Sequence, residues 1–369
     1  MRDGYGSMSE VWSGRSGDGV HDTGGTRPKM GSGTKVEFAA IGFCPAFAGA
    51  DVGRLYEDLG YDIKQFGENH NQSADVFAEM RDAAAATDRI RLLAGPANFV
   101  TRDPGVVASG VAAVQVASAG RAICGIARGD SAVMLAGKRP QRHDDLVRDL
   151  GFLQTYLGGG TLAFGDERSS LEWLGDLPYA PVPVELVCSG PRTIALAAAV
   201  ADRIGLSVGG NPERIRWAME IVAASLAEHG RSPADITVCA YLPIAVTSDR
   251  QSGRRALVAR TAGWAHMSSL PGNDLSAQPA ILQRVTTKLR SGYDYRFHTE
   301  SAPLENANTA MVDPEFADWF GVGGPPSYVA ERLIELVELG VGCFGVAVPR
   351  TEHDEMATEV MPAVRKAVS

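Results

Sequence analysis

The sequence alternates short apolar runs with segments of helical periodicity from Lys35 almost to its end, and this alternation limits the possible folds most strongly. Strands that alternate with helices form parallel sheets, because a crossover must carry the chain back between two parallel strands. Eight such runs without a linker fit a closed (β/α)8 barrel, a TIM barrel, better than an open doubly wound sheet. The predicted strands are residues 36–42, 61–66, 92–94, 122–126, 184–187, 204–208, 236–244 and 343–348.

Two interruptions of this pattern are predicted to be insertions in a single barrel domain, residues 36–369. Residues 158–183 are too polar and too rich in turns for a core element, so we expect this segment to cover a site. Residues 251–318 have a mostly helical pattern. Residues 1–35 are rich in Gly, Ser, Asp and Arg without an apolar signal core, which predicts a disordered or expression-derived tail.

Composition narrows the possible partners. The net charge of -9 is modestly acidic and the basic residues are scattered, which argues against a nucleic acid. No apolar run approaches about 18 residues, so no transmembrane helix is expected. The five cysteines show no CxxC spacing and lie mostly in apolar runs, which indicates buried free thiols in a reducing cytoplasm. A small neutral or anionic molecule remains as the expected partner.

The unit at residues 91–140 combines strand, turn, helix, strand and a polar glycine-containing loop. Its helix begins at Asp103-Pro104, with Asp as the cap and Pro in the first turn. Its two strands end in Gly95-Pro96 and in the loop of residues 128–131. Ligands of parallel α/β folds bind at the carboxyl ends of strands, so we expect both loops to face a ligand.

The loops at that rim offer backbone donors more than reactive side chains. Small turns at 127–131, 189–193 and 209–211 open or precede helices, and such turns bind phosphate through free amides and the helix dipole. No HExxH, GxSxG, GxGxxG or Walker sequence occurs in the right context, and the seven histidines are dispersed, so no metal site is predicted. These features indicate that a bound cofactor supplies the chemistry.

Several ordered motifs resemble the bacterial luciferase-like superfamily, in particular its branch of F420-dependent oxidoreductases that includes methylenetetrahydromethanopterin reductase. The resemblance implies a luciferase-like barrel that transfers a hydride between the deazaflavin F420 and a small organic substrate. The motifs lie between residues 36 and 350 and comprise GPANFVTRDP at 95–104, Gly120-Arg121, GIARGDSA at 125–132, Cys188-Ser189-Gly190-Pro191, Ala201-Asp202, Tyr293-Asp294 with His298, and residues 321–325.

The family places an Asp-His pair after the second strand, with the His close to the isoalloxazine-type ring. The best match here is Asn69-His70 with Glu68 before it, so the carboxylate is missing or displaced by one residue. The resemblance implies His70, flanked by Asn69 and Glu68, as the catalytic residue that hydrogen-bonds the cofactor or passes a proton to the substrate. An ordinary loop histidine with a solvent or backbone partner is the alternative.

Family members carry a non-prolyl cis peptide in a bulge of the third strand, behind the deazaflavin ring. The matching bond here is Gly95-Pro96, and X-Pro bonds adopt cis more readily than other peptide bonds. Asn98 is expected beside the pyrimidine end of the ring, and the loops at 129–131 and 189–192 beside the ribityl and phosphate portions. The implied cofactor-binding residues are Gly95, Pro96, Ala97, Asn98, Ala127, Arg128, Gly129, Asp130, Ser131, Ser189, Gly190, Pro191 and Arg192.

The substrate and the assembly are less defined by the sequence. The resemblance implies Cys44, Tyr293 and His298 as substrate contacts, with a buried thiol as the alternative for Cys44. Two other functions stay open. They are a monooxygenase that uses reduced FMN and oxygen, and a non-catalytic flavin-binding barrel, which Asn69 in place of Asp supports. Family members are commonly dimers formed by flanking helices, so a homodimer is implied.

Overall fold

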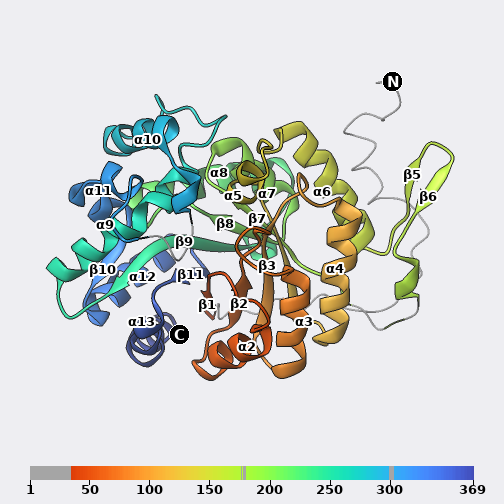
Figure 1. Cartoon of the computed structure of the whole chain (residues 1–369), viewed down its shortest axis with the longest axis horizontal. Helices are drawn as coiled ribbons and strands as arrows, with labels where there is room; N and C mark the ends of the chain where they lie inside the picture. Colours follow the sequence, from red (N-terminus) through yellow and green to blue (C-terminus); the bar gives the residue numbers. More distant parts are fainter. Residues whose placement is uncertain (1–34, 176, 178–179, 299–302) are drawn as a thin grey trace.

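The computed structural model describes residues 35–175, 177, 180–298 and 303–369, so the predicted tail lies outside the described residues except for Lys35. Eight parallel strands close into a barrel, because β8 pairs with β9, β9 with β11 and β11 with β1 (Figure 1). The predicted (β/α)8 barrel and its eight strands are confirmed. They are β1 (Glu37–Ala40), β2 (Ile63–Phe66), β3 (Arg91–Ala97), β4 (Ala122–Ile126), β7 (Val184–Cys188), β8 (Arg203–Leu206), β9 (Thr237–Val246) and β11 (Cys343–Ala347).

The predicted barrel helices surround the strands, and capping residues set where several of them begin. Asp75 accepts hydrogen bonds from the backbone N–H groups of Phe77 and Ala78, and Asp103 accepts one from Gly105 at 2.8 Å. These bonds satisfy amides that have no partner inside a helix. The helices are α2 (Gly49–Asp58), α3 (Val76–Ala86), α4 (Pro104–Ala117), α6 (His143–Leu157), α7 (Pro191–Val200), α8 (Pro212–Glu228) and α12 (Pro326–Glu338).

A paired ionic cluster lies inside the barrel. Arg203 on β8 donates from Nε to Glu185 at 3.0 Å and from Nη1 to Glu37 at 3.0 Å. The Tyr241 hydroxyl donates to the other oxygen of Glu185. Because Glu185 is fully buried, its charge is compensated by these donors instead of by water.

The ring of Tyr241 explains two glycines in the strands on either side of β9. A Cβ atom at Gly205 on β8 would lie 2.6 Å from the ring, and one at Gly345 on β11 would lie 1.9 Å from it. Cβ contacts that short do not occur in unstrained proteins. The barrel therefore closes around this tyrosine because both flanking positions lack a side chain.

The first insertion lies on the flank of the barrel. It forms an antiparallel hairpin of β5 (Leu162–Phe164) and β6 (Glu167–Ser169), followed by η1 (Glu172–Leu174). The Phe164 ring packs edge-on against Phe152 of α6 with centroids 5.6 Å apart, and the Tyr156 and Ser169 hydroxyls lie 2.7 Å apart. The expectation that residues 158–183 cover the site is therefore wrong for the described part, because Phe164 and Ser169 attach the hairpin to α6 on the flank.

The second insertion lies on the opposite side of the barrel in Figure 1 and has its own hydrophobic core. As predicted, it is mostly helical, with α9 (Arg250–Met267), α10 (Ala280–Gly292), η3 (Tyr295–Phe297), η4 (Thr309–Met311) and α11 (Pro314–Phe320). Two features were not predicted. The short strand β10 (Val322–Gly324) pairs with the end of β9, and the chain ends in α13 (Arg350–Glu355), η5 (Met356–Val360) and α14 (Met361–Val368).

The state of the cysteines and the length of the apolar helices can be compared with the expectations from composition. All five cysteines are buried and free, as expected from their positions in apolar runs. Among the described residues, no helix combines the length and the apolar character needed to span a bilayer.

The buried cluster predicts an unequal cost for two arginine substitutions. Arg203→Met leaves buried Glu185 without its cation, so we expect the free energy of unfolding to fall by about 3–5 kcal/mol. Arg284 also pairs with two carboxylates, Asp313 and Glu315, but it is half exposed, so Arg284→Met should have a much smaller effect on stability. Urea denaturation of both variants measures the difference. Equal losses would contradict the role given to the interior cluster.

Candidate active site

The loops that follow β2 and β4 meet at the carboxyl end of the barrel. Asn69, after β2, is fully buried and donates from Nδ2 to the Ser131 hydroxyl at 3.1 Å. Ser131 begins the short helix α5 (Ser131–Leu135) after β4. Asn69 Oδ1 accepts a hydrogen bond from the Asn71 backbone N–H at 3.0 Å, so this side chain holds its own loop as well as the next one.

The bulge predicted in β3 is present. The Gly95–Pro96 peptide is cis, and the register between β3 and β4 shifts between Ala94 and Ala97. From β2, Gln65 donates to the Gly95 carbonyl at 2.7 Å and fixes the bulge from the side of the barrel interior. The chain therefore presents Pro96 at the rim, next to the loops of its neighbouring strands.

Asn98, just after the bulge, is buried, and the oxygen of its side-chain amide already accepts hydrogen bonds. Its Oδ1 accepts from the backbone N–H groups of Val100 and Thr101 at 3.1 and 3.0 Å. Its Nδ2 has no hydrogen-bond partner within the described part of the chain. A Cβ atom at Gly129 would lie 3.5 Å from the Asn98 Cβ, so the β3 and β4 loops touch here. A buried amide with free donors is suited to a carbonyl group of a ligand.

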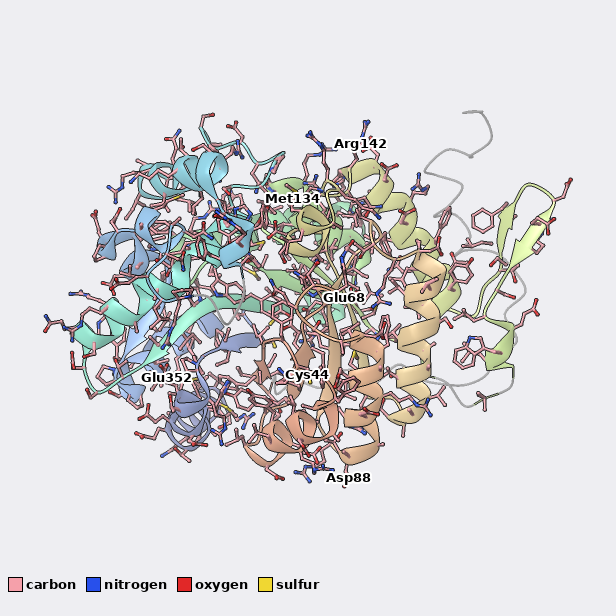
Figure 2. The ribbon with its side chains drawn as sticks, viewed as in Figure 1. Cys44, Glu68, Asp88, Met134, Arg142 and Glu352 are labelled. Atoms are coloured by element: carbon pink, nitrogen blue, oxygen red, sulfur yellow. The ribbon has the colours of Figure 1, made fainter. Side chains whose placement is uncertain are left out.

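The residues beside Asn69 have different environments. Glu68, labelled near the middle of the molecule in Figure 2, forms an ion pair with Arg102. Arg102 also pairs with Asp75 at 2.9 Å. Burial raises the pKa of Glu68, and the Arg102 charge opposes this effect. His70 is exposed, with its Nε2 3.2 Å from the Asn71 amide. The structure thus turns Asn69 inward and His70 outward.

A polar cluster connects the β4 loop to the second insertion. Asp130 accepts a hydrogen bond from the Tyr295 hydroxyl at 2.7 Å, and His266 Nε2 lies 2.9 Å from that hydroxyl and 3.3 Å from Asp130 Oδ1. Tyr293 and His298, expected at the substrate side, are bonded to each other at 2.5 Å.

The insertion also reaches the β2 loop, because Gln72 donates to the His298 carbonyl at 2.6 Å. The second insertion therefore covers the loops that the sequence predicted to hold the ligand. The first insertion does not, since its contacts lie on the flank.

The polar end of the site carries two guanidinium groups. Arg128 donates to the Gln141 carbonyl at 2.8 Å and to the Pro271 carbonyl at 3.2 Å. Burial, and to a smaller extent the charge of Arg192, lower the pKa of Arg128. Arg192 lies in the first turn of α7 and is 72% exposed.

Two predicted elements of that end are already in contact with the insertion. The Ser189 hydroxyl donates to the Met267 carbonyl at 2.7 Å. Gly190 is the N-cap of α7 and Pro191 follows in its first turn, and a Cβ atom at Gly190 would lie 2.0 Å from Asn273 Oδ1. Ala127 donates to the Ala97 carbonyl at 2.9 Å and so ties the β4 loop to the bulge.

Cys44 is a predicted substrate contact that the structure does not bring to the loops after β2, β4 and β7. It is buried, with its thiol 3.6 Å from Glu79 of α3. Burial and the nearby Glu79 raise the pKa of the thiol to about 12, so the group stays protonated at neutral pH.

His266 and Tyr295 were not predicted from the sequence. Tyr295 lies in the GYDYRFHTE segment that was singled out for its neighbours Tyr293 and His298. His266 carried no local signal, because it stands in the last turn of an ordinary helical pattern. Nothing in that pattern indicates that the end of α9 reaches the β4 loop. Among the described residues, no group of three or more His, Cys, Asp or Glu side chains is placed to hold a metal.

Comparison with known proteins identifies the family of this chain. Residues 45–343 match the model of the luciferase-like monooxygenase family. The chain belongs to this family. A curated relative, 5,10-methylenetetrahydromethanopterin reductase of Methanolobus tindarius, is 23% identical over 326 residues, which cover 86% of this chain and 95% of the relative.

Solved luciferase-like structures share the fold. An F420-dependent secondary alcohol dehydrogenase, in complex with an F420-acetone adduct, aligns with a TM-score of 0.69 at 17% identity, over 89% of this chain and 99% of that one. The oxygenating constituent of 3,6-diketocamphane monooxygenase from Pseudomonas putida, in complex with FMN, aligns with a TM-score of 0.59 at 14% identity, over 88% and 99%. The luciferase-like barrel thus serves both a deazaflavin enzyme and a flavin enzyme.

Proposed function

We propose that this luciferase-like protein is an F420-dependent oxidoreductase that transfers a hydride between the deazaflavin and a small organic substrate. The observation that carries the proposal is the combination of the Gly95–Pro96 bulge after β3, the Nδ2 donors of buried Asn98 and the arginines that follow β4 and β7, Arg128 and Arg192. Two kinds of relative support it. One is a methylenetetrahydromethanopterin reductase, and the other is an alcohol dehydrogenase that depends on F420.

The residues of the site fit a ring with an anionic tail. The bulge offers a flat backbone surface, and the Nδ2 donors of buried Asn98 suit the carbonyl groups of a deazaflavin ring. Arg128 and Arg192 are cations that follow β4 and β7, and such guanidinium groups suit the anionic tail of a cofactor. Arg192 also lies 3.8 Å from Asp144, at an exposed position that a cofactor tail would share. When bound, the cofactor would supply the hydride at C5. The alternative cofactor FMN has the same general shape, and the monooxygenase relative supports it.

The chain's own residues would position and protonate the substrate. We assign His70 the predicted proton transfer or cofactor hydrogen bond, with Asn69 holding the β2 loop against Ser131 and Glu68 held by Arg102. Tyr293 and His298 would contact the substrate from the second insertion, since the Gln72 bond places this segment over the β2 loop. Cys44 would act only indirectly, because its thiol is buried against Glu79.

The first prediction concerns the choice of cofactor. Titration of the purified protein with F420 and with FMN, followed by absorbance and fluorescence, should give a dissociation constant at least tenfold lower for F420. Arg192→Met should raise the F420 dissociation constant by up to about fivefold, the range for an exposed ionic contact. Arg216→Met, an exposed arginine on α8, is the control and should not change it. Tight FMN binding without F420 binding would contradict the proposal.

The second prediction concerns His70. With reduced or oxidised F420 and a panel of small carbonyl compounds and alcohols, His70→Ala should lower turnover about 100-fold, as expected for loss of a general acid or base. The F420 dissociation constant should change by less than about tenfold, because His70 is exposed and would contribute at most one neutral hydrogen bond to the cofactor. His229→Ala, another exposed histidine, is the control. Unchanged turnover in His70→Ala would remove this residue from the mechanism. If the native protein and both variants all show no turnover, the non-catalytic flavin-binding alternative is favoured.

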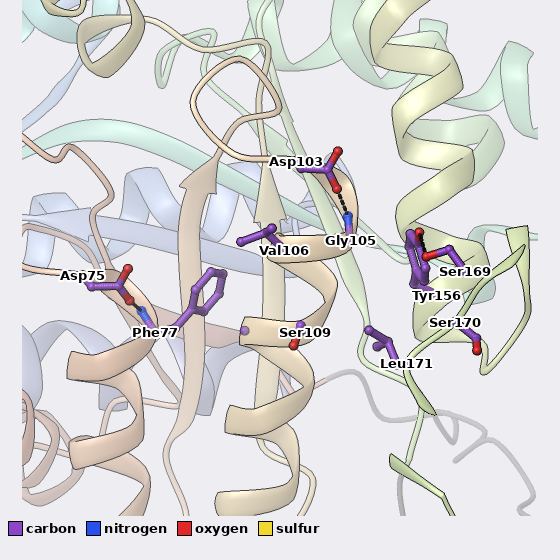
Figure 3. Close-up of a pocket in the computed structure, with 11 residues that line it drawn as sticks. Asp75, Phe77, Asp103, Gly105, Val106, Ser109, Tyr156, Ser169, Ser170 and Leu171 are labelled. Atoms are coloured by element: carbon purple, nitrogen blue, oxygen red, sulfur yellow. Dashed lines mark hydrogen bonds between the residues drawn. The ribbon is translucent and has the colours of Figure 1, made fainter. Parts of the chain in front are cut away.

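The proposed homodimer would use the outer face of α4. This helix contains no charged residue, and its Val106 and Val116 are 55% and 36% exposed. Beside it lies a hollow of about 520 Å³, lined in part by Phe77, Val106 and Leu171 (Figure 3). In a twofold interface α4 would meet α4, so no buried charge would be left unpaired.

The third prediction tests this interface by mass. Light scattering after gel filtration should give a dimer for the native protein and a monomer for the double variant Val106→Glu, Val116→Glu, because burying two carboxylates on each copy is costly. Leu304→Glu, at another exposed apolar side chain, should remain a dimer. A native monomer, or a double variant that stays dimeric, would contradict the placement.

A further inference from the structure

Two arginines of this barrel are equally buried but differ in what surrounds them. Arg203 and Arg214 each leave 4% of their surface exposed. Arg203 pairs with Glu185 and Glu37. Arg214 forms no hydrogen bond or ion pair within the described part of the chain, and its buried Nε has no partner there. Because a buried charge without a partner is costly, we expect a further group beside Arg214.

Arg214 keeps its charge in spite of this burial. Burial lowers its pKa to about 10, which is still well above neutral pH. The preceding residue, Glu213, is exposed, so solvent screens its charge. A group that completes these surroundings must accept hydrogen bonds, and an anion also compensates the charge.

The position of Arg214 directs its side chain to the start of a helix. It is the third residue of α8, which follows the loop after β8 at the carboxyl end of the barrel. Side chains of a helix lean toward its N-terminus, so Arg214 extends along the first turn. Its guanidinium carbon lies 3.9 Å from the centroid of the Trp217 ring. This contact covers one face of the guanidinium plane and leaves the N–H groups at its edge for a ligand.

The backbone of the same turn also keeps a donor free. The N-cap residue Asn211 accepts from the Glu213 N–H at 2.9 Å through its side chain and from the Ile215 N–H at 3.0 Å through its carbonyl. Pro212 has no N–H group. The Arg214 N–H has no acceptor among the described residues. The turn at 209–211 was predicted to bind phosphate, and the proposed cofactor site does not use it. A free amide at the positive end of a long helix suits an anion.

The start of α8 extends past the neighbouring helix toward the second insertion. The Ser225 hydroxyl donates to the Ala195 carbonyl of α7 at 2.7 Å. Ser225 lies about three turns after Arg214, whereas Ala195 lies about one turn after the start of α7. Gly210 donates to the Phe320 carbonyl at 2.6 Å, which ties this end of α8 to the insertion. Arg214 therefore belongs to a different helix N-terminus from Arg192.

We propose that the first turn of α8 is an oxyanion site, in which the guanidinium and the backbone N–H of Arg214 bind a phosphate or carboxylate group of a small molecule. The anion would approach Nη1 and Nη2, because Nε is closed to solvent. It would compensate Arg214 as Glu185 and Glu37 compensate Arg203. The anionic tail of a cofactor and an anionic group of the substrate share this chemistry. The site does not depend on which cofactor the protein uses.

Binding of inorganic phosphate tests the site without a cofactor. Equilibrium dialysis at constant ionic strength should show phosphate binding to the native protein with a dissociation constant on the order of 1 mM. Arg214→Met should weaken the tightest site at least about tenfold, as expected for loss of hydrogen bonds from a charged group. Arg214→Lys should weaken it less, because lysine keeps the charge but not the planar set of donors. Arg216→Met, an exposed arginine of the same helix, is the control and should bind as the native protein does.

The melting temperature in phosphate-free buffer gives a second readout. Arg214→Met removes a buried cation that has no partner there, so its melting temperature should not fall below that of the native protein. Equal phosphate binding by the native protein and Arg214→Met would overturn the proposal, as would a native protein that binds no phosphate up to about 10 mM. If Arg214→Met does not fold, Arg214→Lys decides, and unchanged phosphate affinity in that variant overturns the site.

A titration of the F420-loaded protein with phosphate distinguishes the two sources of the anion. Phosphate binding that is lost in the loaded protein assigns the site to the cofactor tail. Phosphate binding that persists there, and is absent from loaded Arg214→Met, assigns the site to an anionic substrate. The outcomes also separate this inference from the proposed function. Failure to bind F420 contradicts only the function, and phosphate binding that survives in Arg214→Met contradicts only the oxyanion site.

Discussion

The closed barrel depends on how its interior is filled. Glu185 is fully buried, and Arg203 and Tyr241 both donate to it, while Arg203 also pairs with Glu37. Replacing either donor would leave a charge in a low-dielectric interior, where an unpaired ion costs several kcal/mol. Because the tyrosine ring fills the space above Gly205 and Gly345, the strands on both sides of β9 approach it closely. This packing fixes the strand ends from which the ligand loops start.

The site depends in turn on the second insertion. Asp130, Arg128, Ser189 and Gln72 all bond to residues of that segment, so the loops after β2, β4 and β7 share one cover. The two ends of the mouth differ in charge. One end holds the Asp130 carboxylate together with two histidines and two tyrosines, which are His266, His298, Tyr293 and Tyr295. At the other end, the backbone turns and the guanidinium groups of Arg128 and Arg192 suit an anion. We therefore expect a cofactor with an anionic tail to direct that tail toward the Arg128 end.

The fold could be predicted from the sequence because strand and helix periodicities are local signals, and the eight barrel strands were found in this way. The cis Gly95–Pro96 bond was predicted from a motif resemblance, and the structure contains it. Other features depend on long-range packing. The hairpin at residues 158–183 was expected over the site, but Phe152 and Tyr156 of α6 hold it on the flank. His266 could not be found, because only the tertiary fold brings α9 to Asp130. The outward position of His70 and the inward position of Asn69 likewise depend on the Asn69–Ser131 bond between two loops.

The central claim is that the barrel mouth selects a deazaflavin, and the cofactor that the protein carries from a cell tests it most directly. The chain would be produced in a host that makes both F420 and FMN, purified without added cofactor, and its bound small molecule identified by mass and absorption spectrum. The account predicts F420 as the bound species, with occupancy reduced in Arg192→Met. FMN as the bound species, with F420 absent, would contradict it.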